Sequence, residues 1–248
     1  MPTLWEYIFG ALFFSFCIIG MYRAEKRGEQ KMKTIPACNG IPEGIQRSVE
    51  MGRPVLFEFG SIALNLYSQY IGPALGILNE VAKESARLGA HLITISFDPP
   101  STAIMEEIVK NNYILYGRTM EEMDNRYVAG TDRGFTVATL AILEREKPGA
   151  HFLMGTTSYD AVIVCQAAAD IGAFQVAGAI QTFQLPVMSV ICDYVLIGEE
   201  FAVAGSVFSN KLGQLGTIVG HDWAKAVLVG LLILGAILAQ FGLKIVMS

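Results

Sequence analysis

Two long apolar segments, one near each end of the chain, constrain its fold more than any other feature. One runs from about Leu4 to Tyr22 and the other from about Ala226 to Met247. Each approaches the roughly 20 residues that a helix needs to cross the hydrocarbon core of a bilayer. We therefore expect a membrane-spanning helix at each end of the chain. Between them lie about 200 residues, enough for one domain with a sizeable core.

The positions of Lys and Arg predict how the two helices lie in the membrane. No basic residue precedes the first segment, whereas several follow it closely: Arg23, Lys26, Arg27, Lys31 and Lys33. Cytoplasmic flanks of membrane helices are enriched in Lys and Arg, so we expect residues 23–224 in the cytoplasm and both termini outside. The predicted location is the cell membrane, either an inner or a plasma membrane. A cleaved signal peptide would instead carry its charges before the apolar segment.

The composition of the whole chain agrees with two spans around a soluble domain. Hydrophobic residues make up 52% of the chain, yet 17% of its residues are charged, which is too many for a bundle of several spans. The formal net charge of −5 argues against nucleic acid as a partner, because a basic face is the usual footprint of nucleic-acid binding. The basic stretch after the first segment instead predicts contact with anionic membrane lipids.

These features divide the chain into consecutive parts. They are an N-terminal transmembrane helix (1–22), a basic juxtamembrane linker (23–40), a cytoplasmic α/β domain (41–210), a Gly-rich neck (211–224) and a C-terminal transmembrane helix (225–248). We expect the neck to be flexible because Gly213, Gly216 and Gly220 lie close together in it. The four cysteines have neither metal nor redox spacing. Cys38 is expected in a loop, and the other three read as packing residues.

The central domain alternates between short apolar runs and stretches of helical periodicity. The predicted strands are Pro54–Phe59, His91–Phe97, a weaker one at Tyr127–Ala129, His151–Met154 and Phe174–Ala177. The predicted helices are Asn65–Leu88, Ser101–Tyr116, Arg133–Leu143 and Ser158–Ile171, with Ser101 and Asp132 as N-caps. Residues 186–191 fit either a strand or a helix, and a helical stretch follows to about Phe208.

Strands that are apolar throughout, and that alternate with helices, indicate a parallel sheet covered on both faces. We therefore predict an α/β fold with a Rossmann-like, mostly parallel sheet and helices on both sides. Ligands of such sheets bind beyond the carboxyl ends of the strands. The candidate ligand-binding residues at those ends are Glu58, Asp98, Gly155, Thr156, Thr157 and Ser158.

Each half of this candidate site also has a plainer explanation. Gly155 to Ser158 follow a strand and open a helix, so their backbone amides could bind an anion, or Thr157 and Ser158 could simply cap the helix. Glu58 and Asp98 close adjacent strands, so they could hold a metal or share a proton, or could be solvated charges.

Familiar catalytic motifs are missing from the sequence. It contains no G-x-x-x-x-G-K-[ST], no G-x-G-x-x-G after a strand and no G-x-S-x-G. His91, His151 and His221 are far apart in the sequence, so we expect no zinc site. No catalytic residue is therefore assigned, the cofactor is unknown, and the sequence leans against an enzyme.

Two charged clusters are candidate interface residues. Arg145, Glu146 and Lys147 lie between a helix and a strand, where they could form a solvated turn or a contact between domains or subunits. Glu199 and Glu200 lie within an apolar stretch. They could face solvent by periodicity, and if buried they would need cationic partners such as Arg145 and Lys147.

Several short motifs occur in order along the chain. They are Met51–Phe57 (MGRPVLF), Arg145–Pro148 (REKP), Phe152–Gly155 (FLMG), Gln184–Pro186 (QLP), Cys192–Tyr194 (CDY) with Leu196–Glu200 (LIGEE), and Gly220–Lys225 (GHDWAK). In these motifs the chain resembles a family of bacterial and archaeal membrane-anchored α/β proteins of unknown function, over about Ile41 to Leu238. The resemblance implies an α/β region followed by a C-terminal membrane helix, and it supplies no catalytic residues.

The sequence leaves three classes of function open. The favoured one is a non-enzymatic membrane scaffold that self-assembles into a homo-oligomer or tethers a partner, supported by the two anchors and by the small-residue pairs Ala226/Gly230 and Gly235/Ala239. The second is a sensor or enzyme that binds a nucleotide-like or other anionic small molecule at the strand ends. The third is an accessory subunit of a membrane complex.

Overall fold

The chain forms two compact units, one from its middle and one from its two ends. The computed structural model describes residues 4–27, 35–61, 68–156, 160–181, 183–209 and 212–240. Lys33–Ser209 make up the α/β unit, and the segments before and after it make up a helical unit. The α/β unit begins before position 41, where the sequence places its start, because a helix at residues 36–50 packs into its core.

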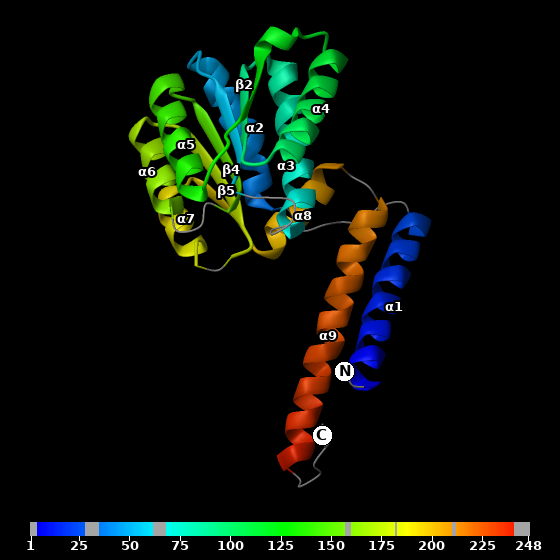
Figure 1. Ribbon diagram of the computed structural model, residues 1–248. Helices are drawn as coiled ribbons and strands as arrows, with labels where there is room; N and C mark the ends of the chain where they lie inside the picture. Colours follow the sequence, from blue (N-terminus) through cyan, green and yellow to red (C-terminus); the bar gives the residue numbers. More distant parts are fainter. Residues whose placement is uncertain are drawn as a thin grey trace. The chain divides into compact units, whose positions relative to one another are not determined.

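A six-stranded parallel sheet is the centre of the α/β unit (Figure 1). Its strands are β1 (Val55–Gly60), β2 (Leu92–Ser96), β3 (Met123–Tyr127), β4 (Ala150–Thr156), β5 (Phe174–Ala179) and β6 (Tyr194–Ile197). Their order is β3-β2-β1-β4-β5-β6, so the direction of winding reverses between β1 and β4. This is the strand order of Rossmann-like doubly wound sheets, and it confirms the predicted α/β fold with a parallel sheet.

Helices cover both faces of this sheet (Figure 1). One layer contains α2 (Pro36–Glu50), α3 (Ser68–Leu88), α4 (Pro99–Leu115) and α8 (Glu199–Ser209); the other contains α5 (Asp132–Glu146), α6 (Ala161–Asp170) and α7 (Leu185–Ile191). A short 3₁₀ helix, η1 (Met120–Glu122), precedes β3. Because successive strand residues point to opposite faces, Phe57 and Phe152 pack under the first layer and Leu56 under the second. Every residue of β1 is buried, which explains its apolar sequence.

Two strands differ from the sequence expectation. The weak strand expected at Tyr127–Ala129 is β3, four residues earlier, and its polar sequence Met-Asp-Asn-Arg-Tyr suits an edge strand. Residues 186–191 are helical, but the helix expected to continue to Phe208 is interrupted by β6. Gly198, with φ of +55°, then allows the sharp turn into α8.

Three local expectations are wrong. Cys38 lies buried in α2 and not in a loop. Pro99 begins α4, so Ser101 lies in its first turn and Asp98 is the N-cap. The N-cap of α5 is Thr131, whose hydroxyl oxygen accepts a hydrogen bond from the backbone N–H of Gly134 at 3.2 Å, and Asp132 is the first helical residue.

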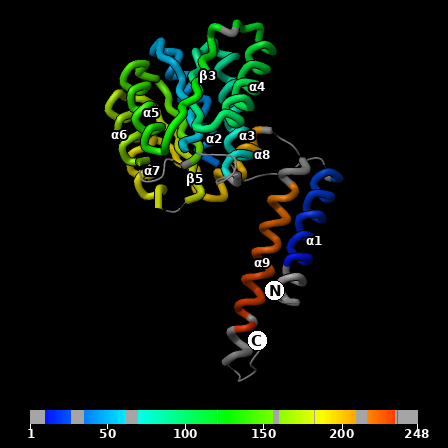
Figure 2. Tube along the Cα trace, viewed as in Figure 1, coloured from blue at the N-terminus to red at the C-terminus, as the bar shows by residue number. Residues whose placement is uncertain are grey.

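The helical unit consists of α1 (Leu4–Arg27) and α9 (Leu212–Gln240), which lie side by side (Figure 2). Their backbones touch directly at glycines. A Cβ atom at Gly20 would lie 2.3 Å from the carbonyl oxygen of Gly216, and one at Gly220 would lie 2.5 Å from that of Phe16. Small residues permit this approach, as they do between membrane helices.

The expected flexible neck at 211–224 is therefore wrong for the described residues from Leu212 onward. Gly213, Gly216 and Gly220 lie within a continuous helix. Glycine weakens an isolated helix by about 1 kcal/mol relative to alanine, but close packing against a neighbouring helix offsets that cost here. Local glycine content alone gave the wrong expectation because the stabilising contact comes from the other end of the chain.

Among the residues that the structure describes, one helical stretch is long and apolar enough to cross a membrane. It runs from Gly216 to Ile233 within α9. It overlaps the second predicted span, which was expected to begin at Ala226, and α1 covers the first predicted segment. Side chains beyond the contact with α1, such as Leu228 and Leu232, are exposed on the surface of the helical unit.

The glycine contact predicts a position-specific sensitivity. Gly220→Val should lower the stability of the helical unit by about 1–3 kcal/mol, because a branched side chain has no space between the two backbones. The measurement is thermal loss of helical circular dichroism for the full chain in mild detergent. Gly230→Val is the matched control, since a Cβ at Gly230 meets nothing within 4 Å. Equal effects of the two variants would show that the helices do not meet at Gly220.

Candidate functional site

The interior of the α/β unit contains a carboxylate paired with an imidazole. Glu58 of β1 is 0% exposed, and its Oε1 lies 2.7 Å from Nε2 of His151 on β4, which is 1% exposed. The parallel register aligns Leu56 with His151. Glu58 lies two residues after Leu56 on the same face of the sheet, and its side chain extends back along the strand to the His151 ring. The pair lies between β1 and β4, where the strand order reverses.

Further polar side chains surround this pair on the face covered by α5 and α6. The Thr139 hydroxyl of α5 donates to Glu58 Oε2 at 3.3 Å. Gln175 of β5 lies directly across from His151 in the register and donates from Nε2 to the carbonyl oxygen of Cys165 at 3.0 Å. The buried charges are thus placed in a hydrogen-bonded network, as buried charges require.

Charge pairing sets the protonation of the histidine. Burial alone lowers the pKa of His151, but the hydrogen bond and the negative charge of Glu58 outweigh it, so the pKa lies above its ordinary value of 6.5. A hydrogen bond to Gln175 acts in the same direction. The pairing therefore favours the protonated form of His151 relative to a histidine in water. Neither side chain of the pair reaches the surface, and the contact joins β1 to β4.

Among the described candidates at the strand ends, Glu58 and Asp98 have different hydrogen-bond partners. Glu58 is inside the protein, and its hydrogen bonds go to His151 and Thr139. Asp98 follows β2, and its backbone carbonyl oxygen accepts from the N–H of Thr102 at 3.1 Å. The expectation that Glu58 is a solvated strand-end charge is therefore wrong. Among the described residues, no group of three or more His, Cys, Asp or Glu side chains could hold a metal ion.

The remaining strand-end candidates lie at the carboxyl end of β4. Gly155 is buried within β4, and Thr156 is its last residue. Thr157 and Ser158 lie outside the described residues. Gly155 neighbours the carboxyl end of β1, because Gly60 aligns with Thr156 in the register.

The charged cluster at the end of α5 forms hydrogen bonds within the chain. Glu146 Oε1 accepts hydrogen bonds from Arg126 of β3 at 2.9 Å and from Arg145 at 2.8 Å, and Arg126 also pairs with Asp124. The network fastens the last turn of α5 to the edge strand. Lys147, in a left-handed backbone conformation with φ of 47°, ends the helix.

The two acidic residues of the other cluster are exposed in the first turn of α8. Glu200 Oε2 accepts the backbone N–H of Ile197 at 3.4 Å. Negative charge in the first turn of a helix is favourable because the helix dipole is positive there. Glu199 and Glu200 therefore need no cationic partner from Arg145 or Lys147.

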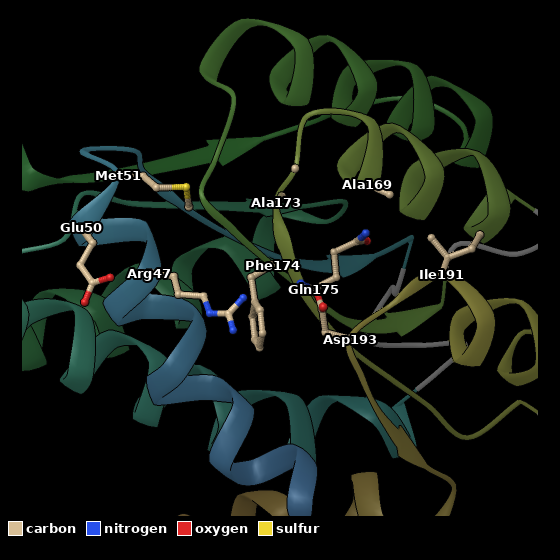
Figure 3. Close-up of a pocket in the computed structure, with 10 residues that line it drawn as sticks. Arg47, Glu50, Met51, Ala169, Ala173, Phe174, Gln175, Ile191 and Asp193 are labelled. Atoms are coloured by element: carbon tan, nitrogen blue, oxygen red, sulfur yellow. Dashed lines mark hydrogen bonds between the residues drawn. The ribbon is translucent and has the colours of Figure 1, made fainter.

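An open pocket of about 420 Å³ lies at the amino ends of β5 and β6 (Figure 3). The guanidinium of Arg47 stacks on the ring of Phe174, 4.8 Å from its centroid, at one side of this pocket. Asp193 lies at the other side, and its Oδ2 accepts the backbone N–H of Gln175 at 2.8 Å. Sequence reasoning missed both this pocket and the Glu58–His151 pair. The only local signal for the pair is one ionisable residue in each of two otherwise apolar strands.

The buried pair predicts a specific pH dependence. Because the pKa of His151 is raised on folding, its stabilising contribution is complete below the unfolded-state pKa of about 6.5 and is lost as the pH rises through the folded-state pKa. Glu58→Gln should lower the pKa of His151, remove this dependence, and destabilise the fold by about 1–3 kcal/mol at pH 6.

Histidine NMR titration of the full chain in detergent micelles measures the first effect, and urea unfolding at several pH values measures the others. The resonances of His91, which is exposed at the start of β2, provide the internal reference. An unchanged His151 titration in Glu58→Gln would contradict the pairing.

Comparisons with known proteins give a family match over nearly the whole chain. No curated protein and no solved structure matches it. The model of one protein family matches residues 2–248, nearly the full length, and that family is described as a domain of unknown function. This confirms the resemblance to an uncharacterised family. The chain belongs to the DUF6754 family.

Proposed function

We propose that the protein is a membrane-anchored scaffold, held in the bilayer by α1 and α9 and self-assembling through its α/β unit at the cytoplasmic surface. The observation that carries the proposal is the two-faced character of the helical unit. Its inner face is a direct backbone contact at Gly20, Gly216 and Gly220, and its outer face is apolar. A helix pair of this kind suits a lipid environment.

The outer face is apolar along both helices. Exposed apolar side chains on α1 and α9 are Leu12, Phe14, Ile18, Ile19, Val227, Leu228, Val229, Leu231, Leu232 and Ile233. In water such a surface would be a large unpartnered patch, whereas lipid chains cover it without cost. This supports two membrane spans, and Gly216 to Ile233 of α9 form a stretch that is long and apolar enough for one of them.

The helices run antiparallel, which supports the proposed topology. Gly220 contacts Phe16 and Cys17, whereas Gly216 contacts Gly20 and Ala24, so rising numbers on α9 meet falling numbers on α1. An antiparallel pair has both termini on one side of the membrane and the intervening unit on the other. The guanidinium of Arg23 stacks on Trp223, 5.3 Å from its centroid, a pairing of interface residues near the cytoplasmic end.

Exposed β-branched side chains on the α5–α6–α7 layer form the proposed assembly surface. They are Val137, Val162, Ile163 and Val190, of which Val190 is 85% exposed. We propose a second copy of the chain as the occupant, because two anchors per chain hold neighbouring copies in one plane and one orientation. Arg145 and Lys147 are exposed on the same layer and are proposed as polar interface residues.

Self-assembly predicts a native mass that is a multiple of 26.9 kDa after gentle detergent extraction of the full chain. Substituting Ile163→Asp together with Val190→Asp should reduce that mass to a single chain, because two buried carboxylates would lose hydration in the interface. Leu115→Asp is the matched control. It lies on α4 in the opposite layer and is 76% exposed.

The same measurement separates the alternatives. A wild-type chain that is alone and monomeric would remove the scaffold function. A stable complex with different chains in fixed ratio would replace it with the accessory-subunit function.

A second function, ligand binding at the strand ends, is favoured by the strand order. The reversal between β1 and β4 places Gly60 and Gly155 near each other at the edge where ligands of such sheets bind. Gly60 has φ of +67°, a conformation that suits a tight turn out of the strand. A nucleotide or similar anion would be the ligand class.

Ligand binding predicts that a nucleoside triphosphate raises the unfolding temperature of the full chain. Thr157→Ala together with Ser158→Ala should abolish that rise and leave the unfolding temperature of the unliganded protein unchanged, because hydroxyl and amide donors at a helix start bind phosphate. A rise that persists in the double variant would exclude these residues from the site.

A further inference from the structure

Two cysteines that are far apart in the sequence are in contact inside the α/β unit. Cys165 lies on α6, and Cys192 lies in the connection between α7 and β6. Their Sγ atoms are 3.6 Å apart, across 27 positions of sequence. Cys192 Sγ also lies 3.9 Å from Oε1 of Gln175. The fold brings the two cysteines together although they are far apart in the sequence.

The two thiols differ in their access to solvent. Cys165 is fully buried, whereas Cys192 is partly exposed. The residues on either side of Cys192, Ile191 and Asp193, line the open pocket at the amino ends of β5 and β6 (Figure 3). A reagent in solvent therefore meets Cys192 before Cys165, whose Sγ lies 3.6 Å from that of Cys192.

We propose that Cys165 and Cys192 form a thiol–disulfide exchange site that closes to an intramolecular disulfide. The co-reactant is a low-molecular-weight disulfide, RSSR. The Cys192 thiolate attacks one sulfur of RSSR, forming a mixed disulfide and releasing the first RS⁻. The Cys165 thiolate then attacks Sγ of Cys192 and releases the second RS⁻. The protein loses two electrons and two protons, and RSSR becomes two RSH.

The surroundings of Cys165 support this order of events. The contact with Cys192 and burial both raise the pKa of Cys165, while His151 lowers it. Once Cys192 is in the mixed disulfide, its thiol no longer competes with Cys165 for negative charge. Of the groups that still surround Cys165, His151 then favours its thiolate, while burial and the charge of Glu58 oppose it.

Closing the disulfide would tie α6 to the chain that enters the edge strand β6. The closed loop contains α7 and all of β5, so the bond would restrict the unfolded chain and raise the thermal unfolding midpoint of the α/β unit. Cys192 is the chain neighbour of Ile191 and Asp193, which line the pocket, so the bond would hold that stretch of the chain to α6.

The test is incubation of the full chain in detergent micelles with glutathione disulfide, followed by mass spectrometry of the peptides. The wild-type chain should give one cross-linked species that joins Cys165 to Cys192 and is lighter by two hydrogens. Cys165→Ser should accumulate a glutathione adduct on Cys192, and Cys192→Ser should give neither product at Cys165. Cys38→Ser, at a buried cysteine of α2, is the control and should behave as the wild type.

Two results would overturn the proposal. In one, both thiols of the wild-type chain stay reduced although the added glutathione disulfide still undergoes thiol–disulfide exchange in the same sample. In the other, the two cysteines carry separate glutathione adducts without a cross-link. Since the wild-type chain gives the primary readout, failure of a variant to fold leaves the test decisive.

Discussion

The direct backbone contact between α1 and α9 is the constraint on which the rest of the molecule depends. Gly20, Gly216 and Gly220 allow two helices from opposite ends of the chain to touch without intervening side chains. The contact fixes the two helices antiparallel, and apolar side chains of both, such as Phe14 and Leu232, are exposed on the surface of the helical unit. The proposed anchoring and topology rest on that arrangement.

Inside the α/β unit, the Glu58–His151 pair has a comparable role. Burying two opposite charges costs free energy, and only good geometry between them recovers it. Such a pair therefore adds little to the stability of the fold but favours one alignment of the two strands that carry it. A slip of β4 by one residue would move His151 to the other face of the sheet and leave Glu58 unpaired. The pair thus favours one alignment of β1 and β4, at the point where the strand order reverses, and His151 acts to lower the pKa of the neighbouring Cys165.

The sequence predicts the parts of this fold whose residues carry their own signal. β1, β2, β4 and β5 are apolar because both of their faces are buried, so their existence and the parallel sheet could be predicted. β3 is a polar edge strand, and the four residues of β6 lie between two helices, so neither has a periodicity of its own. The flexible neck was a wrong expectation because glycine was read by its local propensity, whereas its partner in α1 is about 200 residues away.

The candidate site, too, has residues that could be predicted from the sequence and residues that could not. Residues at strand ends could be found from the pattern of apolar runs, and Gly155 does lie at the strand-order reversal. Glu58 could not be placed correctly, because its partner is chosen by strand pairing between segments 93 positions apart. The contact of Cys165 with Cys192 was likewise invisible, since it depends on the packing of α6 against α7.

The central claim is that an antiparallel helix pair anchors this chain with its α/β unit in the cytoplasm. The most direct measurement is labelling of single cysteines in intact cells with a membrane-impermeant maleimide, in a chain whose native cysteines are replaced by serine. The account predicts labelling of Ser248→Cys in intact cells, and labelling of Lys110→Cys, on the exposed surface of α4, only after permeabilisation. Labelling of Lys110→Cys in intact cells, or of Ser248→Cys only after permeabilisation, would contradict it.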